Sequence, residues 1–190
     1  GFRELGVERV LSVSAAGGIN PELKPGDIVV TDQIIDMTHG RASTFYDGAE
    51  VVHIDFTMPY CPELRNSIFN AGRGTGVGLK DSGTYICVNG PRLETKAEIA
   101  FFAKTGGDVV GMTGMPEACL AREIEICFSG ISVVTNYAAG ISAAKLTAIE
   151  VVETMKVSMD KIRRLLMGTL ENIPSERTCE CKDALKGARM

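Results

Sequence analysis

Apolar and polar positions follow two periods along the chain, and together they predict an α/β domain. Short apolar runs rich in β-branched residues are typical of buried strands, whereas apolar residues at every third or fourth position are typical of helices. The predicted strands cover residues 7–13, 28–35, 83–88, 109–110 and 131–135. The predicted helices cover residues 63–73, 94–104, 116–127 and 143–166. Because strands and helices alternate, we expect helices to cover the sheet of a single α/β domain.

Two segments show neither period. Residues 38–52 combine glycine, serine and charged residues, and we expect an exposed excursion there. Residues 173–190 are rich in charged residues and are predicted to form a polar C-terminal tail. With 190 residues, the chain is long enough for one sizeable core and short for two. We therefore expect one domain over residues 1–172, followed by the tail.

Composition and charge narrow the range of partners. The net charge is -4 and the chain has no basic block, so nothing favours nucleic acid or an anionic membrane surface as a partner. No stretch approaches the roughly 18 uninterrupted apolar residues of a membrane span. The first residues, from Gly1 to Leu5, lack the apolar core of a signal peptide. We therefore expect a cytoplasmic location.

The six cysteines do not form a pattern typical of a disulfide-rich module. The first four are scattered through apolar or amphipathic segments, where free cysteine behaves as a small hydrophobic residue. Cys179 and Cys181 form a C-x-C pair in the predicted tail. Such a pair is consistent with a strained, redox-active disulfide, with metal binding, or with surface thiols that have no role. The sequence leaves these alternatives open.

Four segments that follow predicted strands are rich in small residues, and we expect them to form loops around one pocket. They cover residues 14–18, 90–94, 112–117 and 136–140. In α/β domains ligands bind outside the carboxyl ends of the strands, and accessible backbone N–H groups there suit a phosphate. Pro116 and Glu117 are predicted to open a helix, whose free N–H groups also suit an anion.

Familiar catalytic and metal-binding patterns are absent from the sequence. It contains no Ser-His-Asp pattern, no H-E-x-x-H, no G-x-x-x-x-G-K-[ST] and no cysteine/histidine metal cluster. The pocket is therefore expected to consist of backbone amides, hydroxyls, one carboxylate and one carboxamide. It would bind a small polar ligand with an anion, without a covalent intermediate and without a metal or organic cofactor.

Seven motifs resemble those of purine nucleoside phosphorylases. They are Ser-Ala-Ala-Gly-Gly at 14–18, Pro-Gly-Asp-Ile-Val at 25–29, Ser-Thr-Phe-Tyr-Asp-Gly at 43–48, Gly-Pro-Arg-Leu-Glu-Thr at 90–95, Gly-Asp-Val-Val-Gly-Met-Thr at 107–113, Pro-Glu-Ala at 116–118 and Val-Thr-Asn-Tyr-Ala-Ala-Gly at 134–140. The chain is most similar to the trimeric branch, which holds purine nucleoside phosphorylase and methylthioadenosine phosphorylase. The resemblance implies a single α/β domain with a mixed central sheet, and a homo-oligomer that is a trimer or a dimer of trimers.

The resemblance also implies a reaction. Inorganic phosphate attacks the anomeric carbon of a purine nucleoside and releases the free base and ribose 1-phosphate. Catalysis then consists of holding phosphate against the sugar and stabilising negative charge on the departing base. By position, Ser14, the Ala15 backbone and Thr113 would bind phosphate, and Ala16 and Gly17 belong to the same substrate-binding segment.

The residues implied to contact ribose and base favour a 6-oxopurine. Met112 would pack on the ribose, and Leu93 replaces an aromatic residue that stacks on the base. Glu94 can only accept hydrogen bonds as a carboxylate, which suits the N1–H of a 6-oxopurine. Asn136 is the expected catalytic residue, because its amide can donate to N7. Similar enzymes that cleave 6-aminopurines carry Asp at the Asn136 and Ala138 positions and Ser at the Glu94 position.

The group at the 5′ position of the substrate is less strongly specified. His53 lies where methylthioadenosine phosphorylases place a histidine from the neighbouring subunit over the 5′ group. Around Thr147 and Ala148, where 5′-hydroxyl-specific enzymes carry a histidine, this chain has small residues. We rank inosine and guanosine first, with 5′-methylthioinosine or methylthioadenosine as the alternative.

The chain departs from the family at its start. Family members have an N-terminal part before the first predicted strand, which supplies a glycine-rich phosphate loop and an Arg-His pair. This sequence begins at Gly1 without those groups. We therefore expect either a piece of a longer protein or a shortened homologue. For the latter, the alternatives are a catalytically weakened nucleoside binder and a nucleoside hydrolase in which water replaces phosphate.

Overall fold

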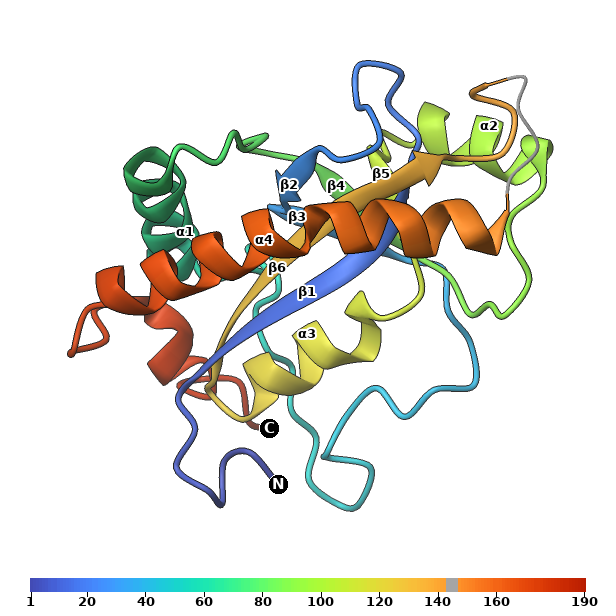
Figure 1. The fold of residues 1–190 in the computed structure, drawn as a ribbon. Coiled ribbons are helices and arrows are strands. Elements are labelled where there is room, and N and C mark those ends of the chain that lie inside the picture. The colour runs from blue at the N-terminus through green and yellow to red at the C-terminus, as the bar shows by residue number, and fades with distance from the viewer. Residues whose placement is uncertain (143–146) are drawn as a thin grey trace.

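The computed structural model describes residues 1–142 and 147–190 as a six-stranded sheet with flanking helices (Figure 1). The strands are β1 (Arg9–Gly18), β2 (Ile28–Val30), β3 (Gln33–Asp36), β4 (Thr84–Cys87), β5 (Val109–Gly111) and β6 (Cys127–Tyr137). The helices are α1 (Pro62–Thr75), α2 (Lys96–Lys104), α3 (Gly114–Glu123) and α4 (Ala148–Asn172), with a short 3-10 helix η1 (Glu180–Asp183). The predicted start of the last helix, at 143, lies outside the described residues.

The sheet is mixed, as the resemblance implies. Its strand order is β2-β6-β1-β5-β4-β3. The central strands β1 and β6 run parallel, β2 and β5 run antiparallel to their neighbours β6 and β1, and β3, β4 and β5 are mutually parallel. The predicted fold class, one α/β domain with a mixed sheet, is therefore confirmed.

Strand β6 connects the two largest groups of core residues. Ile131 and Val133 face the helices α1 and α4, whereas Phe128 and Val134 belong to the core that packs against α3. Alternate residues of a strand point to opposite faces, so β6 is buried on both sides. Figure 1 shows the long helix α4 crossing β6.

Helix boundaries follow local signals. The first helix begins with Pro62 and ends at Thr75, before Gly76, which adopts a left-handed φ of 68° that glycine tolerates best. The second is preceded by Thr95, which accepts a hydrogen bond from the Glu98 N–H while the Glu98 carboxylate accepts one from the Thr95 N–H. This capping box places the start of α2 two residues after the predicted start at Glu94.

The expectation of a loop over residues 14–18 is wrong, because these residues continue β1. They pair in parallel with β6 as far as Gly18 with Tyr137, with a register shift after Ala16. A Cβ added at Gly17 would lie 3.3 Å from both the Asn136 amide nitrogen and a Val110 methyl carbon. The small residues therefore allow close strand packing and do not mark a turn. Asn136 and Tyr137, expected in a loop, likewise belong to β6.

The prediction of a single strand over residues 28–35 is also wrong. It divides into β2 and β3, which form opposite edges of the sheet. Between them, the Asp32 carboxylate accepts a hydrogen bond from the Gly83 N–H at 2.9 Å. Both strands contain β-branched apolar residues, so periodicity alone cannot show that the chain crosses from one edge to the other.

The helix predicted over residues 116–127 has different limits in the structure. Helix α3 begins at Gly114, but Met115 has non-helical backbone angles, and the peptide bond between Met115 and Pro116 is cis. Because the helix is interrupted at Met115, its regular part starts at Pro116, as the sequence predicted. The helix ends at Glu123, and Glu125 adopts a positive φ of 58° before Cys127 starts β6. This backbone reversal separates helix from strand.

The segment 173–190 packs on the domain. Its Thr178 donates from N–H and hydroxyl to the Glu63 carboxylate at 2.9 and 2.7 Å. Cys179 and Cys181 are buried, so the pair does not lie on a polar surface as one of the alternatives supposed. Among the described residues, no helix is long and apolar enough to cross a membrane.

Candidate active site

A cavity of about 330 Å³ lies where the second half of β1 meets β6 and the end of β5. Nine of the eleven predicted site residues line it: Ser14, Ala15, Ala16, Gly17, Leu93, Glu94, Met112, Thr113 and Asn136. Its volume is within the range of small-molecule sites. Since β5 runs antiparallel to β1, the cavity is not at a common carboxyl edge of parallel strands, as the sequence led us to expect. It follows the length of β1 instead.

Ser14 and Thr113 line this cavity and also line a small second pocket, together with Ser132 and Tyr85. The Ser14 and Ser132 hydroxyl oxygens lie 3.2 Å apart, and the Thr113 N–H donates to the Tyr85 hydroxyl at 3.4 Å. Burial raises the pKa of Tyr85 despite hydrogen bonds with Thr113, so this phenol stays a neutral donor. A Cβ at Gly111 would overlap the Tyr85 hydroxyl, so glycine is required there. No pattern in the sequence singled out Tyr85 or Ser132.

The Asn136 side chain is held in a defined orientation. Its carbonyl oxygen accepts a hydrogen bond from the Thr135 hydroxyl at 2.8 Å, and its NH₂ donates to the Tyr137 carbonyl at 2.9 Å. Only 6% of the residue is exposed. The NH₂ group carries a second proton, and the residue lines the cavity. Thr135, which also lines the cavity, was not predicted as a site residue.

Glu94 is half-buried at the same cavity. Burial raises the pKa of its carboxyl, and the negative charge of Glu98 adds to this effect, while its own backbone N–H and Arg92 oppose it. Arg92 binds the Glu98 carboxylate through both guanidinium nitrogens at 2.9 and 2.7 Å. Because Arg92 is paired with Glu98, the Glu94 carboxylate is available to bind a ligand. Leu93 beside it is 46% exposed.

Arg41 fastens the segment that carries Met112 and Thr113. Its guanidinium donates to the Met112 carbonyl at 2.9 Å, to the Met115 carbonyl, and to the Val88 and Asn89 carbonyls at 3.3 and 3.2 Å. The sequence placed Arg41 in an exposed excursion. The structure instead uses it to join the ends of β4 and β5 behind the cavity.

Two predicted site residues do not line the cavity. His53 is exposed, and its N–H donates to the Ala188 carbonyl at 2.8 Å. Ala138 is buried in an apolar cluster with Ile86 and Val110. A larger cavity of about 730 Å³ lies between β1 and α3, and none of the predicted site residues lines it.

A mixed α/β sheet with a cavity beside its central strands is found in many α/β proteins, and the comparison with known families identifies which family this chain belongs to. The model of the phosphorylase superfamily matches residues 2–171. The chain therefore belongs to the phosphorylase superfamily.

Curated relatives narrow this family to nucleoside phosphorylases, which are pentosyltransferases. The chain is 54% identical to the 6-oxopurine nucleoside phosphorylase of Pyrococcus furiosus, with 97% of this chain and 72% of the relative covered. It is 52% identical to a probable S-methyl-5′-thioinosine phosphorylase of Thermodesulfovibrio yellowstonii, with 99% and 71% covered. The family and the enzyme class predicted from the motifs are confirmed.

Solved structures agree with the fold. Methylthioadenosine phosphorylase from Schistosoma mansoni in complex with adenine superposes with a TM-score of 0.94 at 26% identity, covering 100% of this chain and 75% of that chain. A methylthioadenosine phosphorylase from an Antarctic soil metagenomic library gives a TM-score of 0.90 at 31% identity, covering 99% and 67%.

Proposed function

We propose that the protein cleaves 6-oxopurine nucleosides with inorganic phosphate, releasing free base and ribose 1-phosphate. The observation that carries this proposal is a single cavity that holds Glu94, Asn136, Met112, Thr113 and Ser14 together. Four curated relatives at 50–56% identity are named as 6-oxopurine nucleoside phosphorylases or probable ones. A role in purine salvage follows from this activity.

In the proposed reaction the Ser14 and Thr113 hydroxyls and the Ala15 N–H hold phosphate against the ribose. A phosphate oxygen forms a bond to the anomeric carbon as the bond from that carbon to the purine breaks. The electron pair of the broken bond goes to the purine ring, and the free proton of the Asn136 amide stabilises it at N7. The nucleophile is phosphate, so the protein supplies positioning and electrostatic stabilisation.

Glu94 distinguishes 6-oxopurines from 6-aminopurines in this proposal. A 6-oxopurine carries a proton on N1, which donates to the carboxylate. A 6-aminopurine presents a lone pair at N1 instead, and a lone pair facing a carboxylate is repelled. Inosine and guanosine are therefore the preferred substrates, and adenosine is a poor one.

A 5′-methylthio nucleoside is the second candidate substrate. Val151, an apolar residue of α4, lines the same cavity and would suit a methylthio group better than a hydroxyl. Relatives at 52% and 47% identity are named probable S-methyl-5′-thioinosine phosphorylases. The 6-oxopurine preference is the same for both candidates.

We also propose that the protein forms a trimer or a dimer of trimers. His53 lies outside the cavity of its own chain and is exposed, so it is available to a neighbouring subunit's site. A cytoplasmic location stays a prediction from the sequence, as does the division into residues 1–172 and 173–190.

The test is a comparison of kcat/KM for inosine, guanosine, adenosine and 5′-methylthioinosine at several phosphate concentrations. Inosine or 5′-methylthioinosine should exceed adenosine by at least about tenfold, equivalent to ~1.4 kcal/mol in the transition state. The rate should rise with phosphate. A rate independent of phosphate would indicate a hydrolase. Calorimetric binding of hypoxanthine without any turnover would indicate a nucleoside binder. Either result contradicts the proposal.

A further inference from the structure

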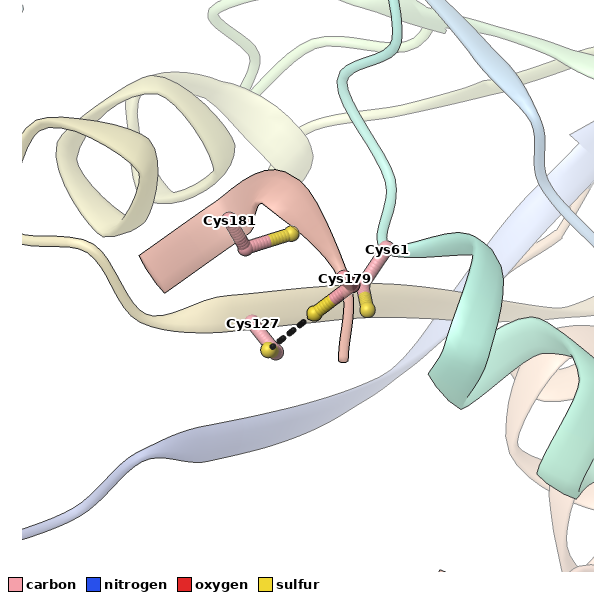
Figure 2. A group of neighbouring side chains, drawn as sticks. All are labelled: Cys61, Cys127, Cys179 and Cys181. Atoms are coloured by element: carbon pink, nitrogen blue, oxygen red, sulfur yellow. Dashed lines mark hydrogen bonds between the residues drawn. The ribbon is translucent and has the colours of Figure 1, made fainter. Parts of the chain in front are cut away.

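Four cysteines from three distant segments meet in the interior (Figure 2). Cys61 precedes α1, Cys127 opens β6, and Cys179 and Cys181 flank the start of η1. All four sulfur atoms lie within 4.8 Å of one another, and those of Cys127 and Cys179 are 3.3 Å apart. Their residues are between 0% and 8% exposed. These four residues are called the cysteine cluster below.

The spacing of the cysteine cluster matches a tetrahedral thiolate site. Zinc binds four cysteine sulfurs at about 2.3 Å, so the sulfurs of such a site are ~3.8 Å apart. Each sulfur of the cluster has the other three as neighbours, which a single ion requires. The C-x-C spacing is shorter than is usual for zinc, but both side chains reach the cluster because η1 begins between them.

Two sources of positive charge lie beside the cysteine cluster, Arg177 and the N-terminal end of α1. Four thiolates around Zn²⁺ carry a net charge of -2, which needs compensation in a buried site. The Arg177 side chain lies beside Cys127, where its charge can compensate part of this. Cys61 lies at the N-terminal end of the 14-residue helix α1, where the helix dipole favours a negative charge.

We propose that the cysteine cluster binds one Zn²⁺ ion as a structural site. Binding converts four thiols to thiolates and releases four protons as the four Zn–S bonds form. The ion would join the segment 173–190 to α1 and β6, beside the hydrogen bonds from Thr178 to Glu63. The site lies apart from the candidate active site, since none of its cysteines lines that cavity. The proposal is independent of the proposed function.

The sequence alone did not reveal this site. Cys61 and Cys127 are far apart along the chain and lie in apolar surroundings, so each is typical of a small hydrophobic core residue. Only the fold brings them to the C-x-C pair.

The test is the zinc content of the purified protein, prepared without a polyhistidine tag, with reductant and with zinc in the medium. Mass spectrometry of metals should find about one zinc per chain. Cys127→Ser should lower this to below about a tenth of an ion. Cys119→Ser is the matched control, because Cys119 is one of the two cysteines outside the cluster, and this variant should retain the zinc.

A second measurement on the unchanged protein covers the case in which Cys127→Ser fails to fold. Removing zinc with a chelator and adding Co²⁺ should give the visible absorption of tetrahedral, thiolate-bound cobalt. The proposal would be overturned if the purified protein held no zinc, if all four thiols of the cluster could be alkylated, and if added Co²⁺ gave no such absorption. An intact mass lower by four hydrogens without zinc would overturn it too, because it would show two disulfides.

Discussion

Asn136 is the residue on which the chemistry of the proposed reaction depends most. The Thr135 hydroxyl and the Tyr137 carbonyl hold its amide, so the proton that remains is presented in a fixed direction. Such pre-organised donors stabilise charge that develops in a transition state at no reorganisation cost. The sequence predicted the residue, and the structure adds the two groups that orient it.

Asn136→Asp should shift preference toward 6-aminopurines, because a protonated carboxyl can donate a proton to N7 where the amide only donates a hydrogen bond. The ratio of kcat/KM for inosine to that for adenosine should fall by at least about tenfold, ~1.4 kcal/mol. Steady-state assays of both nucleosides measure it. Asn70→Asp on the exposed face of α1 is the control and should leave the ratio unchanged. An unchanged ratio for Asn136→Asp would rule out its proposed role.

Glu94 should make substrate binding sensitive to acid. Burial raises the pKa of its carboxyl above the ordinary 4.5, so protonation on acidification begins at a higher pH than for an exposed glutamate. Because only the carboxylate accepts the N1–H, KM for inosine should rise as the pH falls through this raised pKa. Glu94→Gln should remove that rise while increasing KM at neutral pH. A pH profile of kcat/KM checks both.

The raised pKa of Glu94 also affects the stability of the fold. The effect is opposite to that of an acid whose pKa is lowered by a salt bridge. A carboxyl whose pKa is raised in the folded state destabilises it when ionised, so the cost is absent at low pH and present above the raised pKa. Glu94→Gln should therefore raise Tm at neutral pH and have no effect on Tm in acid. A lower Tm at neutral pH would contradict this.

At the scale of elements, the segment between β5 and α3 is held in place by Arg41, a side chain from residues 38–52. Arg41 satisfies carbonyls at the ends of two neighbouring strands, and no other described cation is hydrogen-bonded to them. Hydrogen bonds that involve a charged group contribute more than neutral ones, about 1.5–3 kcal/mol each. The segment with Met112 and Thr113 is thus positioned by a residue outside the cavity.

Arg41→Met should lower kcat/KM for phosphorolysis by at least about tenfold, since loss of the guanidinium frees the residues that hold ribose and phosphate. KM for phosphate should rise together with the fall in kcat. Arg73→Met, on the last turn of α1, is the control and should affect neither. If Arg41→Met lowered Tm but left kcat and KM for phosphate unchanged, Arg41 would be a structural residue without a positioning role.

At the scale of the whole molecule, the cavity joins strands from both halves of the chain, so its ligand should stabilise the whole fold. A ligand that binds only the folded state adds about 2.7 kcal/mol to the free energy of unfolding when its free concentration is a hundred times its Kd. Hypoxanthine should raise Tm by roughly 5–10 °C under these conditions, and adenine at the same concentration should raise it less. Scanning calorimetry of the protein with each base measures this. An equal shift for both bases would contradict the proposed specificity.

The sequence by itself determined the class of fold and most of the candidate site. Hydrophobic periods located the helices α1, α2 and α3 and most strands, because each element must bury one face. The motifs located Glu94 and Asn136, because the types of hydrogen-bonding group are properties of single residues. Tyr85, which contacts Thr113, and Thr135, which holds Asn136, were missed, because an isolated tyrosine or threonine in a strand carries no periodic signal.

Tertiary structure alone decided what depends on contacts between distant segments. It converted the glycine-rich residues 14–18 from an expected loop into strand, since close approach to β6 excludes larger side chains. It brought Arg41 behind the candidate site and gathered four cysteines that local sequence placed in separate surroundings. Periodicity describes which residues are buried, whereas the partner of a buried residue is set by strand order and helix packing, which no local pattern contains.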